Sequence, residues 1–217
     1  MKRTSILLAA VLLLMTCLSA NAQEDEEYDV LELCFYGGAG APLGTMGDWH
    51  DSLGAKPGWS VGLDFGYFAT SDLVVGFNFV YTQMGIDGPD EVSGASHRLY
   101  NPNLYAKYYF IGESNFEPYV KAHVGIENPK FTSSLVEGPK YKSISYDPSI
   151  AYGIGAGLFF YSADYSGLYL EVNYHRAMTG DAAVEFINPE QPTLTFDEDL
   201  STLDIHIGIR LLVGSDE

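Results

Sequence analysis

Charged side chains recur within stretches of the chain that are otherwise apolar or small. They are Glu32, Asp64, Lys107, Lys121, Glu171, Asp204 and Arg210, and His123 and His206 occupy similar positions. Charges in apolar surroundings are costly unless they are paired, so the mixture of signs predicts a structural network of salt bridges. A gated path for ions is the functional alternative for the same residues.

Histidine could instead serve hydrolysis or acyl transfer, which requires a serine and an acid beside it. His97 and His175 are each followed by an arginine and then an apolar residue, so neither forms a His-x-Ser pair. His50 lies in the polar loop at residues 43–56. We therefore expect no enzymatic activity, no bound metal and no cofactor.

Residues 57–83 show how such side chains would be positioned. They predict two strands joined by a tight turn at residues 69–72, with apolar residues at every second position. In the first strand these are Trp59, Val61, Leu63, Phe65 and Tyr67, and in the second Leu73, Val75, Phe77, Phe79 and Tyr81. A period of two sends alternate residues to opposite faces of a sheet, so one face is apolar and the other carries the small and polar residues.

These two faces favour a membrane barrel over a sheet facing water. The polar face is rich in glycine and poor in long charged side chains, unlike the solvated face of an antiparallel sheet. The apolar face has Trp59 and Tyr81 at one end and Tyr67 near the other, as in the aromatic girdles of outer-membrane strands. A soluble, secreted, lipocalin-like barrel is the alternative.

The same alternation predicts six further strands, which makes eight in all. They lie at about residues 30–41, 98–111, 118–127, 149–161, 168–175 and 203–211. The connections at 69–72, 112–115 and 162–164 are short, whereas those at 43–56, 84–96, 128–147 and 177–200 are long. This alternation is typical of an antiparallel up-and-down barrel with short periplasmic turns and long extracellular loops. The last strand must close on the first, so Arg210 and Glu32 are expected to meet near the short-turn rim.

The start of the chain predicts export. Residues 1–22 have a basic beginning, an apolar run and the ending Ala-Asn-Ala, which is the pattern of a secretory signal peptide. Residues 23–29 form an acidic lead-in, and residues 30–217 form one barrel domain. Lipidation at Cys17 is the alternative to simple cleavage. After cleavage Cys34 has no partner for a disulfide, and we expect it to be a small interior side chain.

The composition argues against a nucleic-acid-binding protein and against a protein that spans the membrane with helices. The chain has 29 acidic and 11 basic residues and a net charge of -18, which makes it a poor partner for nucleic acid. No run of about 20 apolar residues follows the signal, so a membrane-spanning form of this chain must be a closed barrel.

The signal peptide, the eight alternating strands and the two lengths of connection resemble the small eight-stranded outer-membrane barrels of the OmpA transmembrane-domain and OmpX type. The resemblance implies an all-β fold in the outer membrane of a Gram-negative bacterium, with both termini in the periplasm and lipid around the wall. One departure is the end of the chain. Many members finish the last strand with an aromatic residue, whereas residues 212–217 read Leu-Val-Gly-Ser-Asp-Glu.

Two of the long connections contain strand-like sequence. Residues 130–136 and 141–146 predict one hairpin, and residues 184–187 and 193–196 predict another. Strands that project beyond a membrane offer edges for strand addition, which suits an adhesin-like surface for an extracellular protein or a host-surface ligand. We expect a structural or surface-binding role with a lumen plugged by paired charges. A narrow porin-like channel is the second interpretation, and a lipid-modifying enzyme is the third.

Overall fold

The computed structural model describes residues 30–47, 54–86, 96–111, 115–132, 141–145, 147–163, 165–186 and 194–214. The elements are β1 (Leu31–Leu43), the short 3-10 helix η1 (Gly44–Gly47), β2 (Gly58–Phe68), β3 (Leu73–Gly85), β4 (Ser96–Tyr109), β5 (Phe116–Thr132), β6 (Tyr141–Ser145), β7 (Ser149–Ala163), β8 (Ser166–Phe186) and β9 (Leu194–Val213). The predicted signal peptide, the acidic lead-in and His50 lie outside the described residues.

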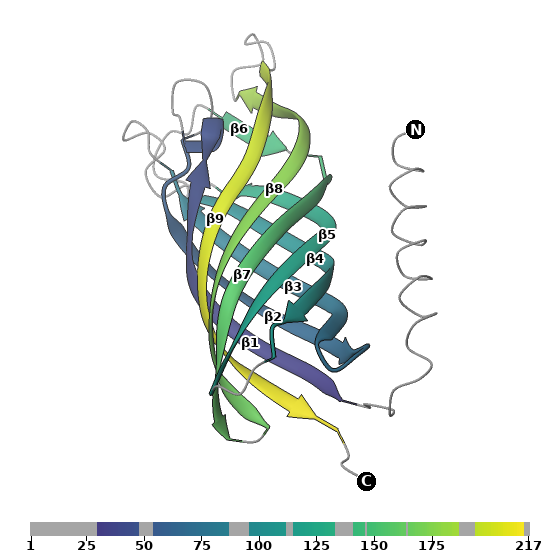
Figure 1. Cartoon of the computed structure of the whole chain (residues 1–217). Coiled ribbons are helices and arrows are strands. Elements are labelled where there is room, and N and C mark those ends of the chain that lie inside the picture. The colour runs from purple at the N-terminus through teal and green to yellow at the C-terminus, as the bar shows by residue number, and fades with distance from the viewer. Residues whose placement is uncertain are drawn as a thin grey trace.

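Eight strands, all except β6, form a closed antiparallel barrel (Figure 1). Each strand pairs with its neighbours in the chain, and β1 also pairs with β9, with Leu31 opposite Val213 and Leu43 opposite Ser201. The predicted eight-stranded, all-antiparallel fold is confirmed. The start of β1 and the end of β9 lie at the same end of the barrel, which is also the end with the short turns (Figure 1).

The period-two alternation sorts side chains between the lumen and the outer surface. In β2, Ser60 and Asp64 are buried, whereas Trp59, Val61 and Phe65 are exposed. The other barrel strands repeat this pattern, so large apolar side chains cover the outside and polar ones fill the inside. An exposed apolar wall of this kind suits contact with lipid. Among the described residues, no helix is long and apolar enough to cross a membrane.

The connection between β2 and β3 is the tight turn that the sequence predicts. The backbone N–H groups of Ala69 and Thr70 both donate to the carbonyl of Leu73, at 2.8 and 3.3 Å. The Thr70 hydroxyl accepts from the Leu73 N–H at 3.1 Å and donates to Asp72 Oδ1 at 2.9 Å. These bonds satisfy the backbone groups at the turn, so the two strands can reverse direction within a few residues.

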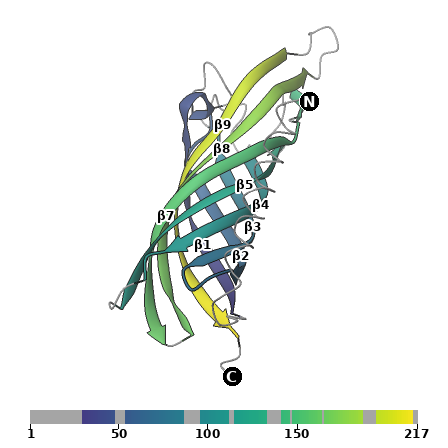
Figure 2. The same cartoon turned by 45° about the vertical axis from the view of Figure 1, so that its right-hand side comes forward.

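The long-connection end departs from the predicted arrangement in one place. β6 pairs with the end of β8, with Tyr141 opposite Phe186 and Ser145 opposite Ala183. The described residues therefore do not form the predicted hairpin between 130–136 and 141–146. The second predicted hairpin is present as the continuation of β8 and β9, where Val184 pairs with Leu194. Figure 2 shows β8 and β9 rising beyond the other strands.

Candidate functional site: the charged lumen

An ion pair between β1 and β4 lies across the lumen near its short-turn end. Glu32 is the second residue of β1, and Lys107 lies two residues before the end of β4. Lys107 Nζ is 2.6 Å from Glu32 Oε1, and both side chains are buried. The Tyr109 hydroxyl donates to the other oxygen of Glu32 at 2.5 Å. A buried carboxylate with these partners is held in one geometry, because each of its oxygens accepts a short hydrogen bond.

Asp64 and Lys121 continue this pair into a chain of alternating charges. Lys121 Nζ is 2.8 Å from Asp64 Oδ2 and 3.6 Å from Glu171 Oε1. Lys107 Nζ also approaches Asp64 Oδ2, at 3.7 Å. Each acid thus lies beside at least one ammonium group, which offsets the cost of removing these charges from water.

Arg210 closes the charged chain at the short-turn end. Its guanidinium lies 3.5 Å from the centroid of the Phe159 ring, 3.8 Å from Glu32 Oε2 and 3.9 Å from Glu117 Oε2. It also donates to the Tyr161 hydroxyl at 3.3 Å. The predicted meeting of Arg210 and Glu32 is therefore present in the geometry, but Lys107 is the nearer partner of Glu32. We name Glu32, Asp64, Lys107, Lys121, Glu171 and Arg210 the ionic layer.

Tyrosine rings fill the space around the ionic layer. They belong to Tyr36, Tyr105, Tyr109, Tyr119 and Tyr169, all buried. The Tyr119 hydroxyl donates to Glu171 Oε2 at 3.0 Å, and the Lys107 ammonium lies 5.2 Å from the centroid of the Tyr119 ring. Glycine on the inner face makes this possible: a Cβ on Gly62 would lie 2.4 Å from the Tyr36 ring, and one on Gly157 would lie 2.4 Å from the Tyr119 ring. The glycines of the polar face thus make room for tyrosines on neighbouring strands.

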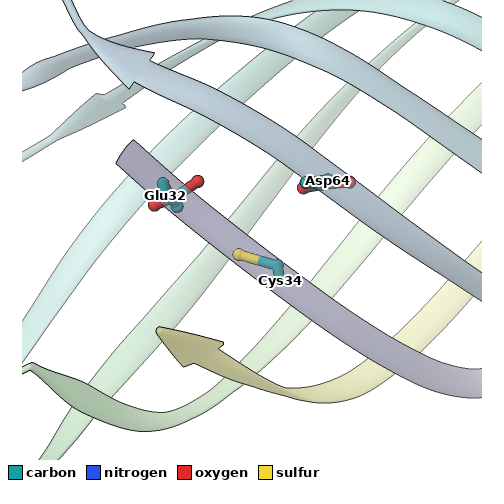
Figure 3. A group of neighbouring side chains, drawn as sticks. All are labelled: Glu32, Cys34 and Asp64. Carbon is teal, nitrogen blue, oxygen red and sulfur yellow. The ribbon is translucent and has the colours of Figure 1, made fainter. Parts of the chain in front are cut away.

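Glu32, Cys34 and Asp64 form a group that could in principle hold a metal ion. Their ligand atoms lie within 4.8 Å of one another, from adjacent positions on β1 and β2 (Figure 3). However, Lys107 Nζ lies among them, at 2.6 Å from Glu32, 3.7 Å from Asp64 and 3.9 Å from Cys34 Sγ. An ammonium group in this position repels a cation, so the group fits a lysine and not a metal.

A second polar cluster lies nearer the long-connection end of the lumen. His175 Nε2 is 2.6 Å from Glu127 Oε2, and the His175 and His123 rings stack with centroids 5.4 Å apart. The Asn101 amide donates to Glu127 Oε2 at 3.0 Å. We name Asn101, His123, Glu127 and His175 the histidine layer. Glu127 is fully buried, and no lysine or arginine is among the partners described for it.

Ser60, His206 and Glu171 form a serine, histidine and acid arrangement that sequence reasoning missed. Ser60 Oγ is 2.9 Å from His206 Nε2, and His206 Nδ1 is 3.8 Å from Glu171 Oε1. Such a set can activate a serine as a nucleophile. Here the serine is 1% exposed, and Glu171 already lies beside Lys121 and Tyr119. The arrangement therefore has the residue types for acyl transfer, but its serine is buried inside the barrel.

The structure brings most of the predicted lumen residues together and separates two of them. All six ionic-layer residues were predicted, and His206 touches that layer through Glu171. His123 lies in the histidine layer, and Asp204 lies apart with Thr202, whose hydroxyl donates to Asp204 Oδ2 at 2.8 Å. Sequence reasoning missed Glu117 and Glu127 as network members. Both lie on the inner face of β5, so the alternation itself could have identified them.

An apolar cluster lies beyond the histidine layer, toward the long connections. It consists of Met46, Ala55, Met84, Leu99, Ala151, Ala177 and Leu200, all buried. Met46 comes from η1, which follows β1 directly. This cluster covers the polar lumen from one end, and Arg210 with its aromatic neighbours fills the other end.

No protein-family model matches this chain, and no curated protein matches it as a relative. Solved structures do match. OprG from Pseudomonas aeruginosa, an outer membrane protein, covers 86% of this chain and 95% of its own, with 16% identity and a TM-score of 0.59. Neisserial surface protein A covers 84% and 96%, with 17% identity and a TM-score of 0.55. The outer membrane protein AlkL, solved in lipid bilayers, covers 89% and 95%, with 16% identity and a TM-score of 0.54. At these identities the likeness establishes the fold.

Proposed function

We propose that this chain, which has the eight-stranded fold of small outer-membrane barrels, is a non-enzymatic surface-binding protein of a Gram-negative outer membrane. Its long connections face the cell exterior, and both termini face the periplasm. The observation that carries this proposal is the extension of β8 and β9 beyond the barrel wall. β8 continues to Phe186, although its last pair with β7 is at Met178, and β9 begins at Leu194, before its first pair with β1 at Ser201.

This extension already accepts an added strand on one side. β6 pairs along the edge of β8 at Ala183–Phe186. On the other side, no described strand pairs with residues 194–200 apart from β8 itself. An unpaired edge presents backbone N–H and C=O groups, which an extended segment of another protein can bind by strand addition. The ligand class that fits is therefore an extracellular or host-surface protein with an exposed extended segment.

The lumen supports this choice over the two alternatives. An open pore needs a continuous aqueous path, whereas the ionic layer and its tyrosines are buried and packed against one another. A lipid-modifying enzyme needs a reactive group that lipid can reach, whereas Ser60 and His206 are both 1% exposed inside the barrel.

Removal of the extension tests the proposal. A variant in which Asn-Gly replaces residues 179–198 should still assemble, because every pair of the barrel wall remains, up to Met178 opposite Asp199. We expect cells that express it to lose adhesion to immobilised extracellular-matrix proteins. The matched control replaces residues 87–95 by the same two residues, which shortens another long connection and leaves the extension intact. Full adhesion by the assembled extension variant would contradict the proposal.

A narrow channel is the second candidate, because polar side chains line the lumen from Glu117 to Glu127. Planar-bilayer recordings separate it from the closed barrel. We expect the wild-type protein to give no stable current steps, since the charges are held in pairs. Robust single-channel currents from the folded wild-type protein would make the channel the better assignment.

A further inference from the structure

Charged residues on the barrel strands are sorted by sign between the two faces of the wall. Where side chains are described, the strand acids all face the lumen and are buried: Glu32, Asp64, Glu117, Glu127, Glu171 and Asp204. Among the barrel-strand residues whose side chains are described, the charged ones on the outer face are Arg98, Lys130 and Arg176, all basic. Acids outnumber bases 29 to 11 in the whole chain, so this basic set is the reverse of what composition alone would give.

Two of these bases lie directly opposite each other. Arg98 of β4 and Lys130 of β5 are cross-strand partners, and Gln83 of β3 pairs with Arg98 on its other side. Like charges in this position repel and destabilise a sheet. The outward residues of these strands supply no acid to offset them. An anion shared between the two side chains would turn this repulsion into attraction.

The details of the two side chains fit an anion with several oxygens. Arg98 Nε is buried and has no hydrogen-bond partner within the protein. Lys130 Nζ lies 5.3 Å from the centroid of the Tyr100 ring, which holds the flexible chain against the wall. A guanidinium donates in a planar fork that matches phosphate oxygens, and the ammonium adds a point charge beside it.

An aromatic row places this pair at the depth of lipid headgroups. Trp59 and Tyr81 lie with ring centroids 5.3 Å apart, and Tyr81 and Tyr100 lie 5.1 Å apart, across the outer faces of β2, β3 and β4. Arg98 lies on the same face of β4 as Tyr100, two residues closer to the long-connection end. Tyrosine and tryptophan belts mark the membrane interface, so a base just beyond the belt meets headgroups and not acyl chains.

We infer that Arg98 and Lys130 form a binding site for the phosphate of a lipid in the leaflet at the long-connection rim. The aromatic row contacts the upper part of the acyl chains, and Lys56, exposed beside Gly85 at the adjoining strand end, extends the basic surface. The site lies on the outer wall and does not depend on the proposed strand addition at the rim. With the long connections outside the cell, the lipid is a phosphorylated glycolipid of the outer leaflet.

Lipid retention by the full mature protein tests this site. The probe is diphosphorylated lipid A, with its dephosphorylated form as the comparison, added to detergent micelles and measured by native mass spectrometry. We expect the wild-type protein to retain the phosphorylated form preferentially, and Arg98→Gln/Lys130→Gln to retain it about tenfold less. Arg176→Gln is the matched control, because it removes an outward arginine from β8 and should leave retention unchanged.

Three outcomes would overturn the inference. They are equal retention of both lipid forms by the wild type, unchanged retention by the double variant, and displacement of the lipid by millimolar inorganic phosphate. The last outcome would show a site for a free anion. Adhesion of the double variant is measured in parallel. Because the variant keeps the extension of β8 and β9, loss of lipid retention with normal adhesion separates this site from the proposed surface binding.

Discussion

Glu32 and Glu127 are both fully buried glutamates inside the barrel, but they meet different partners. Glu32 lies against the ammonium of Lys107 at 2.6 Å and the guanidinium of Arg210 at 3.8 Å. Glu127 lies against the imidazole of His175 at 2.6 Å and receives a hydrogen bond from the Asn101 amide. The ionic layer therefore opposes permanent charges, whereas the histidine layer surrounds its acid with groups that can be neutral.

Because their partners differ, the two layers should differ in how much stability a substitution costs. Removing one charge from the ionic layer leaves its partners buried without a counter-charge, which costs several kcal/mol. Removing the charge of Glu127 leaves hydrogen-bonding groups that an amide can still satisfy. The short-turn end should thus tolerate substitution poorly, and the histidine layer should tolerate polar replacements.

The largest effect is expected for Lys107→Met. This change strips Glu32 and Asp64 of a shared ammonium group and should lower the free energy of unfolding by about 3–5 kcal/mol. Urea unfolding in detergent micelles, followed by tryptophan fluorescence, measures it. Lys130→Met removes an outward lysine and is the control, with an expected change of about 0.5 kcal/mol or less. A loss below about 1 kcal/mol for Lys107→Met would show that the ionic layer is not held by charge pairing.

A matched pair of substitutions compares the two layers directly. Glu32→Gln and Glu127→Gln make the same chemical change at two fully buried positions. We expect Glu32→Gln to cost about 2–3 kcal/mol, because Lys107 and Arg210 lose their shared counter-charge, and Glu127→Gln to cost about 1 kcal/mol or less. The same unfolding assay measures both. Equal losses at the two positions would remove the distinction between the layers.

The sequence predicted which residues face the lumen because a sheet has a fixed period of two. Once Trp59 was placed outside, Ser60 and Asp64 had to lie inside, and the structure agrees. β8 and β9 are longer than the expected 168–175 and 203–211, at Ser166–Phe186 and Leu194–Val213. Other ranges were close, and β7, for example, was expected at 149–161 and is observed at Ser149–Ala163. Such features follow from local patterns, which the chain displays residue by residue.

The partners across the lumen could not be predicted in the same way. Glu32 and Lys107 come from strands that are not neighbours, and their contact depends on the tilt of the strands and the length of each side chain. Because β1 and β9 are neighbours, the sequence predicted Arg210 as the ion-pair partner of Glu32. In the structure Lys107 is closer to Glu32, at 2.6 Å, than Arg210 is, at 3.8 Å. The predicted hairpin between 130–136 and 141–146 was wrong for a related reason. An edge strand can pair with whichever extended segment lies beside it, and for β6 that segment is β8.

The smallest effect is expected at an acid outside the lumen, Asp72 in the turn between β2 and β3. Asp72 accepts hydrogen bonds from the hydroxyls of Thr70 at 2.9 Å and Ser71 at 3.2 Å. A further hydrogen bond from the Tyr108 hydroxyl is the main cause that holds the pKa of Asp72 below its ordinary value. Its set of partners is thus as rich as that of Glu32, but Asp72 is partly exposed to solvent.

Asp72→Asn therefore tests whether burial or the number of hydrogen bonds sets the cost of losing an acid. We expect a loss of about 0.5 kcal/mol, because water screens an exposed carboxylate and hydrates its partners when it is gone. Since the folded-state pKa is lowered, the wild-type advantage should be complete above the unfolded pKa of about 3.9 and disappear as the pH falls through the lower folded value. Unfolding of both proteins between pH 7 and pH 3 measures this difference. If Asp72→Asn cost as much as Glu32→Gln at neutral pH, hydrogen bonding and not burial would explain the sensitivity of the ionic layer.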